Sequence, residues 1–212
     1  MVGTAAPSRN LEFAAGRRLN RLVTTIGAST PQRRPAWHLF IPLLGGLLVA
    51  ETIGIVAREL IGSPYAQSAP WFRLFFSDTL HLKAWLAMAA LFLACTQLFT
   101  AAWIFRKLPW TRPRFVNLVH RFAGRLAFLV TIPVAYHCVF KLGFQTYSTR
   151  LTVHSFFGVA VYGAFATKVL IVRMHRFPRW TLPVAGGLLF AALVGVWWTS
   201  SFWFFRTSGE GI

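Results

Sequence analysis

Five long apolar runs dominate the chain, and each is bounded by polar or basic residues. The runs cover residues 37–57, 80–104, 115–143, 151–171 and 182–205. A helix needs about 20 apolar residues to cross the hydrocarbon core of a bilayer. The pattern therefore predicts an all-α, polytopic membrane protein, in which residues 37–205 form a bundle of five transmembrane helices.

The segments outside these runs are short. Residues 1–36 are basic and nearly free of acid, which predicts either a solvated cytoplasmic tail or a short interfacial helix over residues 11–26 that lies on anionic lipid. Residues 58–79 are too polar and too interrupted by proline to span, so we expect an interfacial loop with one short surface helix. Residues 206–212 are predicted to form a short outer tail.

Composition supports this class and excludes a nucleic-acid-binding domain. The 212 residues are 56% hydrophobic and only 13% charged, whereas soluble domains carry about 25% charged residues. The net charge of +17 comes mostly from Lys and Arg at the ends of the apolar runs, and not from a stripe on one soluble face. The positive-inside rule then places the N-terminus of this multi-pass membrane protein in the cytoplasm, with the spans in contact with membrane lipids.

Three of the six histidines, His120, His137 and His154, lie within residues 119–158. A short polar turn over residues 145–149 is centred midway between His137 and His154, so a helical hairpin would place these two imidazoles at one depth. An ionisable group inside a membrane is costly, and by default it suggests a functional site. We therefore expect the histidines to ligate the iron of haem b.

The ligand pairing is left open by the sequence. The first pairing is His137 with His154, and the second is His81 with His154, which would leave His137 as a hydrogen-bond partner. His120 lies about 25 Å from His137 along one helix, at 1.5 Å per residue, which would suit a second haem. The second axial ligand of that haem, opposite His120, would have to be His38 or His175. Both flank spans beside arginines, so the sequence favours one haem over two.

A glycine follows each of two histidines at the fourth position: Gly124 after His120, and Gly158 after His154. Residues four apart lie on the same face of a helix, so each glycine would leave a hollow beside an imidazole, where a porphyrin plane could lie. The alternative is close helix packing through small residues, which is common in membranes.

Charged side chains near the predicted haem edges have two interpretations. Arg121, Arg125 and Lys141 either pair with haem propionates or extend to the membrane interface. Glu51 lies within the first span, where it either forms a structural ion pair with Lys83 or takes protons from a quinol.

Two further patterns concern packing and quinone binding. Residues 42–48 and 183–189 share the pattern Pro-x-x-Gly-Gly-Leu-Leu, which indicates either a common surface for close helix contact or chance similarity. Tyr136, Tyr147 and Tyr162 either line a quinone pocket or pack within the membrane. No nucleophile–base arrangement, metal-binding motif or phosphate-binding glycine loop is present in the sequence.

Short motifs carry a resemblance to known membrane proteins. They are His-Arg-x-x-Gly-Arg at 120–125, and the segments 82–87, 133–138 and 154–155. The pattern resembles small bacterial membrane cytochromes b of the cytochrome b561 and ferric-reductase-like groups and, across residues 80–205, a family of five-span bacterial proteins without assigned function. The cytochrome resemblance implies four haem-ligating histidines on four successive spans. This chain departs from that arrangement, because its third span has two histidines and its fifth has none.

The sequence as a whole predicts an electron-transfer subunit rather than a stand-alone enzyme. The subunit would bind haem b and relay electrons between the quinone pool and a redox protein at the outer face, within a larger respiratory complex. The alternative is a cofactor-free membrane scaffold whose histidines and glycines only pack helices. A proton-coupled transporter is disfavoured because acidic residues are scarce within the spans.

Overall fold

The structure is a computed structural model that describes residues 35–68, 70–174 and 177–208. The interfacial helix proposed for residues 11–26 and the candidate ligand His175 lie outside the described residues. Contacts divide the chain into Met1–Arg34 and Pro35–Ile212, and all the elements below belong to the second unit.

Five helices in the described part of the chain are long and apolar enough to cross a membrane, which confirms the predicted class. They are Trp37–Glu59, Thr79–Ile104, Val116–Leu142, Thr149–Met174 and Thr181–Thr207. The elements are η1 (Ala36–Leu39), α2 (Phe40–Glu59), α3 (Pro64–Ser68), α4 (Thr79–Ile104), α5 (Val116–Tyr136), η2 (His137–Leu142), α6 (Thr149–Met174), α7 (Thr181–Trp197), η3 (Trp198–Phe202) and α8 (Trp203–Ser208). The described residues contain no strand, α3 is the surface helix expected within residues 58–79, and α8 continues past the predicted end of the last span at residue 205.

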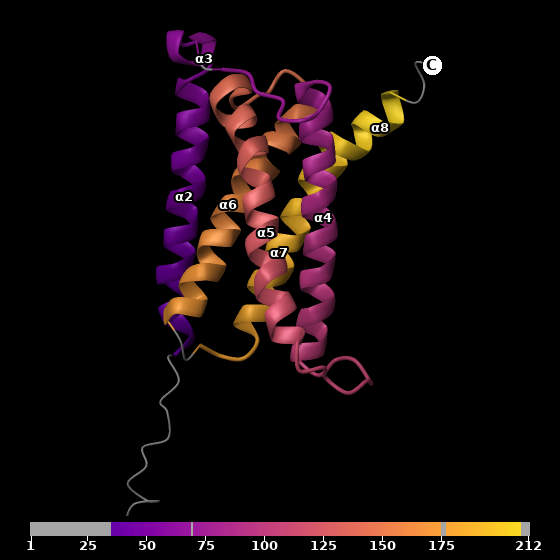
Figure 1. Cartoon of the computed structure of the whole chain (residues 1–212). Coiled ribbons are helices and arrows are strands. Elements are labelled where there is room, and N and C mark those ends of the chain that lie inside the picture. The colour runs from indigo at the N-terminus through magenta and orange to yellow at the C-terminus, as the bar shows by residue number, and fades with distance from the viewer. Residues whose placement is uncertain (1–34, 69, 175–176, 209–212) are drawn as a thin grey trace, which may run out of the picture. The chain divides into compact units, whose positions relative to one another are not determined.

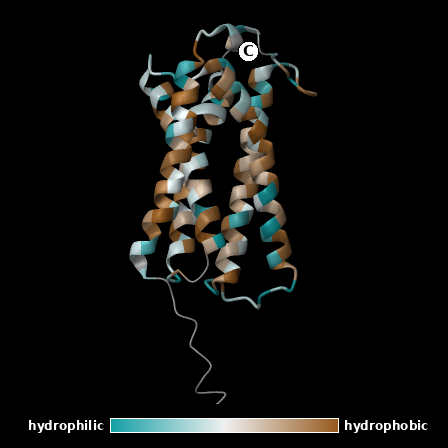
Figure 2. Cartoon of the chain, turned by 90° about the vertical axis from the view of Figure 1, so that its left-hand side faces the viewer, coloured by the Kyte–Doolittle hydropathy of each residue, from teal (hydrophilic) through white to brown (hydrophobic). Residues whose placement is uncertain are grey.

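The outward faces of the helices are strongly apolar. Leu48, Phe92 and Phe122 are 69%, 73% and 60% exposed, and hydrophobic colour runs along the helices in Figure 2. Exposed side chains of this kind are stable only in an apolar solvent, because each would cost about 1.5–3 kcal/mol in water relative to burial. The bundle therefore has the surface of a membrane-embedded protein.

Among the spans, α5 packs on α4, α4 on α7, α7 on α6 and α6 on α2 (Figure 1). α5 and α6 meet through aromatic side chains: the rings of Phe128 and Phe165 stack at 4.4 Å, and the Tyr162 hydroxyl donates to the Thr131 carbonyl at 3.3 Å. α4, α5, α6 and α7 therefore form a ring, and α2 packs outside it, mainly on α6. Both α2 and α5 keep an outward face of exposed apolar side chains.

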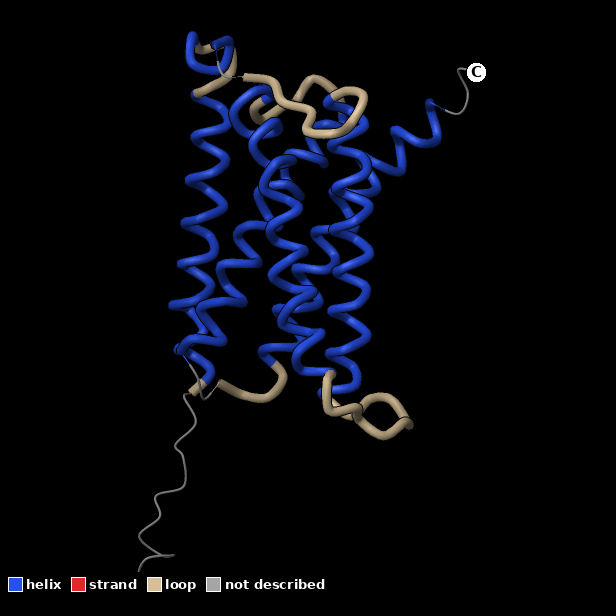
Figure 3. Tube along the Cα trace, in the orientation of Figure 1, coloured by secondary structure: helices blue, strands red, loops and turns tan. Residues whose placement is uncertain are grey.

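The connecting segments lie at two ends of the bundle (Figure 3). The loops after α4 and α6 lie with the start of α2 at one end, here called the basic end because its loops hold Arg106, Lys107, Arg112, Arg114 and Arg179. The α2–α4 connection, with α3 and residues 70–78, covers the other end, here called the capped end. The prediction that the basic end faces the cytoplasm rests on this clustering of basic loops.

Small residues allow α2 and α6 to approach closely. A Cβ atom built on Gly46 would lie 1.8 Å from Thr167 Oγ1 and 2.6 Å from the Gly163 carbonyl oxygen, so only glycine fits. The related glycines of α7, Gly186 and Gly187, have nothing within 4 Å of such an atom. The sequence repeat therefore does not give a common packing surface within this chain.

Two π-helical segments, η2 and η3, occur near the capped end. η2 begins at His137, four residues after Pro133. It ends at Gly143, whose φ of +71° and close approach to the Ala57 carbonyl both require glycine. π-Helical turns often occur at functional sites, and these two segments carry His137 and Thr199.

Candidate functional site

His154, on the second turn of α6, has one ring nitrogen fixed by α7. Its Nδ1 lies 3.0 Å from Thr199 Oγ1. The Thr199 hydroxyl has a single proton and lies 2.8 Å from the Gly195 carbonyl oxygen, to which it donates. The hydroxyl must therefore accept from Nδ1–H of His154, which leaves the lone pair of neutral His154 on Nε2.

His120, near the start of α5, is held in the same way by α4. Its Nδ1 lies 2.8 Å from Thr100 Oγ1, and this hydroxyl donates to the Thr96 carbonyl at 2.7 Å. The side-chain amide of Gln97 also donates to the backbone carbonyl of His120. The lone pair of neutral His120 is therefore on Nε2 as well.

His137 is fully buried beneath the loop that covers the capped end. Its Nε2 donates to the Phe72 carbonyl oxygen at 2.9 Å, because a carbonyl can only accept. The imidazole also stacks on the Trp71 ring, with 5.3 Å between centroids and 11° between planes. Nδ1 of His137 is buried without a hydrogen-bond partner among the described residues. An acceptor left in this state is energetically costly unless another group meets it.

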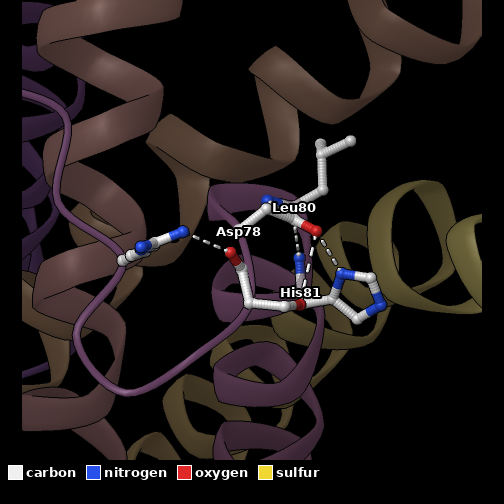
Figure 4. A network of polar contacts seen from close by, with 5 residues as sticks. Asp78, Leu80 and His81 are labelled. Atoms are coloured by element: carbon white, nitrogen blue, oxygen red, sulfur yellow. Dashed lines mark hydrogen bonds and ion pairs between the residues drawn. The ribbon is translucent and has the colours of Figure 1, made fainter.

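His81 lies at the surface of the capped end, where it belongs to a helix cap (Figure 4). Its Nδ1 donates to Oδ2 of Asp78 at 2.6 Å, while Oδ1 of the same carboxylate accepts the backbone N–H groups of Leu80 and His81. Because the side chain of His81 is 46% exposed, it is a less buried candidate ligand than His137 or His154.

The cap predicts a pH-dependent contribution to stability. The backbone N–H of His81, followed by its ring N–H, lowers the pKa of Asp78 from the usual value. Because this folded-state pKa is depressed, the carboxylate stabilises the fold above the unfolded-state pKa, and the contribution is lost as the pH falls through the folded-state pKa. We expect Asp78→Ala to lower the melting temperature at pH 7 by a few degrees, and this difference to shrink as the pH falls through the folded-state pKa of Asp78.

The control for this prediction is Asp78→Asn, which keeps a capping oxygen but has no charge. We expect its melting temperature at pH 7 to fall between those of the wild type and Asp78→Ala. Equal melting temperatures for all three proteins between pH 3 and pH 7 would contradict the assigned cap. Circular dichroism in detergent micelles measures the difference.

The two glycines beside histidines differ in their surroundings. A Cβ atom built on Gly158 meets nothing within 4 Å, so the space beside Gly158 is open on the same face of α6 as His154. A Cβ atom on Gly124 would lie 3.0 Å from Oε1 of Gln97. The hollow predicted beside His120 is therefore filled by α4, as the packing interpretation requires.

Lys83, on α4, is a charged residue whose electrostatic effect reaches the buried histidines near the capped end. Its ammonium is near enough for its charge to act on His137, Cys138 and His154. From the sequence, Lys83 was considered only as an ion-pair partner for Glu51, one of two interpretations of that glutamate.

Lys168 is a residue of α6 that the sequence analysis missed. It is partly buried on the basic side of the bundle, and its charge acts on His120. A lysine within an otherwise apolar run was the available signal, because ionisable residues inside spans suggest function by default. No linear pattern marked Thr100 or Thr199, since their roles depend on which helix lies opposite.

Four other charged residues had two interpretations each, and the structure bears on all of them. Arg121 and Arg125 are exposed on the outward face of α5, which matches extension to the membrane interface and not propionate pairing. Glu51 is exposed on α2 and has no ion-pair partner within the described residues, which excludes the expected pair with Lys83. Lys141 donates instead to the backbone carbonyls of Ala66 and Gln67.

The remaining sequence candidates have structural contacts. His38 stacks on Trp37 at the start of α2. Because α2 does not pack on α5, His38 is not placed to share a haem with His120. The hydroxyls of Tyr136 and Tyr162 donate to backbone carbonyls, and Tyr147 is 80% exposed. Among the described residues there is no group of three or more His, Cys, Asp or Glu side chains that could hold a metal ion. Axial ligation of a haem needs only two.

Residues 39–211 match a protein family described as a family of unknown function, DUF6529. This chain belongs to the DUF6529 family. The match covers four spans completely and the first span from its third residue, and it includes His81, His120, His137 and His154. No curated protein and no solved structure matches the chain. Membership of DUF6529 is consistent with the predicted likeness to five-span proteins without assigned function, whereas the likeness to membrane cytochromes b stays a prediction.

Proposed function

We propose that this protein is a haem-b-binding membrane subunit that transfers electrons. The supporting observation concerns the two buried histidines near the capped end: one ring nitrogen of each carries a hydrogen, and the other carries a lone pair. Each of His137 and His154 donates one ring N–H to a fixed acceptor and keeps a lone pair on its other nitrogen. Histidines that ligate metals are commonly oriented by such a hydrogen bond on the second nitrogen.

The residues that would hold the haem come from three elements. His154 offers Nε2 beside the open space at Gly158, and His137 offers the buried, unpartnered Nδ1. Lys83 supplies a cation next to both histidines, which suits a propionate carboxylate. At His120 the corresponding space is filled by Gln97, so we propose one haem and not two.

When bound, a haem with two imidazole ligands supplies one-electron transfer, because its iron has no open position for oxygen chemistry. His120 and Lys168 suit a different role on the basic side. The lone pair on Nε2 of His120 can accept from a quinol hydroxyl, and the Lys168 ammonium can donate to a quinone carbonyl. We propose this position for exchange with the quinone pool, and a redox protein as the partner at the capped end.

A cofactor-free scaffold is the second candidate function. The hydroxyls of Thr100 and Thr199 and the Phe72 carbonyl form hydrogen bonds with the three histidines inside the spans. Buried polar groups form such bonds in any well-packed interior, with or without a cofactor, which favours this second candidate. Reduced-minus-oxidised absorption spectra of the purified full-length protein, expressed with haem supply, separate the two candidates. A sharp b-type α band and a pyridine-haemochrome content near one haem per chain support the first, and a featureless spectrum overturns it.

The hydroxyl of Thr199 provides a finer test, because it fixes His154 without touching the haem. Thr199→Val removes the acceptor for Nδ1–H and is expected to weaken haem retention by about 10- to 100-fold. Thr199→Ser is expected to restore retention. The matched control is Thr100→Val, which makes the same change at His120 and is expected to leave haem content unchanged. Haem release to apomyoglobin measures retention, and equal rates for Thr199→Val and the wild type would contradict this role.

A further inference from the structure

α2 and α5 each carry a charged side chain on the uncovered outward face. On α2 the exposed side chains include Leu44, Leu48 and Ile55, with Glu51 among them. Glu51 has no hydrogen-bond or ion-pair partner within the described part of the chain. A lone carboxylate that faces lipid in mid-span is costly, so some group is expected to meet it.

On α5 the uncovered face carries the opposite charge. Leu118, Phe122 and Leu129 are 58%, 60% and 56% exposed, and Arg125 is exposed among them. Arg125 likewise has no hydrogen-bond or ion-pair partner among the described residues. The inward face of α5 is identified by His120, which contacts Thr100 of α4. Arg125 therefore cannot be satisfied by the interior of its own bundle.

The two charges lie at comparable depths. A Cβ atom on Gly54 would contact Val159, which places Glu51 near the middle of α6. Phe128 stacks on Phe165, so Arg125, about one turn before Phe128, lies somewhat nearer the basic end. The offset along the helices is about six residues, or roughly 9 Å at 1.5 Å per residue. The long arginine side chain can cover much of this offset.

We propose that the α2 face of one copy of this protein docks against the α5 face of a second copy, with Glu51 paired to Arg125. Both helices run from the basic end to the capped end (Figure 1), so two copies inserted in the same orientation meet as parallel helices. The contact is heterologous, because it joins different faces of the two copies. It satisfies both charges with groups that the chain itself supplies, and it does not depend on haem.

Charge reversal tests the pairing in the intact protein. Energy transfer is measured between donor-labelled and acceptor-labelled copies in liposomes of phosphatidylcholine and phosphatidylglycerol. Wild-type copies are expected to associate above the level of random mixing. E51R and R125E are each expected to weaken association by at least about tenfold, because like charges then face each other. The double variant E51R/R125E, and a mixture of E51R copies with R125E copies, are expected to regain it.

The matched control is E59R, which reverses an exposed glutamate at the membrane-surface end of the same helix and is expected to leave association unchanged. Thermal unfolding of each variant confirms that it folds. Random mixing of wild-type copies, as for a monomer or a protein that docks on a different partner, overturns the proposal. So does unchanged association of the single variants, or failure of both combinations to restore it.

Crosslinking gives a second readout that does not depend on charge. In a C95S/C138S background, L48C copies are mixed with L129C copies, since both positions are exposed and lie at similar depth. Oxidation is expected to join the two kinds of copy. It is not expected to join L48C to L98C, because Leu98 is an exposed position on α4, outside the proposed contact. Equal yields for the two mixtures would overturn the proposal.

Discussion

His154→Ala is expected to reduce the haem content of the purified protein by at least about tenfold, because it removes the ligand whose geometry fits best. Nε2 of His154 carries the lone pair, and the open space at Gly158 lies on the same helix face. The measurement is pyridine-haemochrome quantitation per chain, read together with the amplitude of the α band. His137→Ala is expected to have a similar effect, since its Nδ1 is the buried lone pair on the neighbouring element.

Two matched variants make this experiment decisive about the ligands. His120→Ala is expected to retain the haem, because the space beside His120 is filled by Gln97. His81→Ala separates the two pairings: retained haem supports His137 with His154, and lost haem supports His81 with His154. If His154→Ala and His137→Ala both keep the wild-type spectrum, these residues are not the ligands, and the proposed site is wrong.

Gly46→Leu is expected to give the largest loss of stability among single substitutions in the interfaces between spans. The new Cβ atom alone would overlap Thr167 Oγ1 and approach the Gly163 backbone carbonyl, so α2 must move away from α6. Overpacking of this kind costs about 1–3 kcal/mol and occasionally more. For a domain of this size we expect the melting temperature to fall by about 5–10 °C.

The control for this prediction lies within the same sequence pattern. Gly187 of α7 occupies the position equivalent to Gly46, yet it has no neighbour within 4 Å. Gly187→Leu is therefore expected to change the melting temperature by no more than a degree or two, as measured by light scattering or tryptophan fluorescence during heating. If both leucine variants were destabilised equally, the effect would come from helix propensity or insertion and not from the α2–α6 contact.

The sequence was sufficient for the architecture because membrane insertion depends on local properties. Run length and hydropathy decide whether a segment spans, since the bilayer imposes the same thickness on every helix. The same local information predicted the surface helix within residues 58–79 and the clustering of basic loops at one end. It also indicated that His120, His137 and His154 lie inside spans.

The sequence could not decide what each buried side chain meets. The pattern of histidine followed by glycine at the fourth position is the same at Gly124 and Gly158, yet Gln97 fills the space beside Gly124, and nothing lies within 4 Å of a Cβ atom on Gly158. Similarly, Arg125 was a candidate partner for a bound group and Lys83 was a candidate partner for Glu51. Only the packing of α4 and α5 left Lys83 partly buried and Arg125 exposed.

Sequence alone thus determined five spans, their boundaries and the depth of the histidines, because these follow from hydropathy along a single helix. The tertiary structure alone decided which ring nitrogen of each histidine is free, which glycine has a neighbour, and which charges face lipid. The physical reason is that hydrogen bonds and steric contacts between helices depend on rotation about each helix axis. That rotation is set by the neighbouring helices and not by the run of apolar residues.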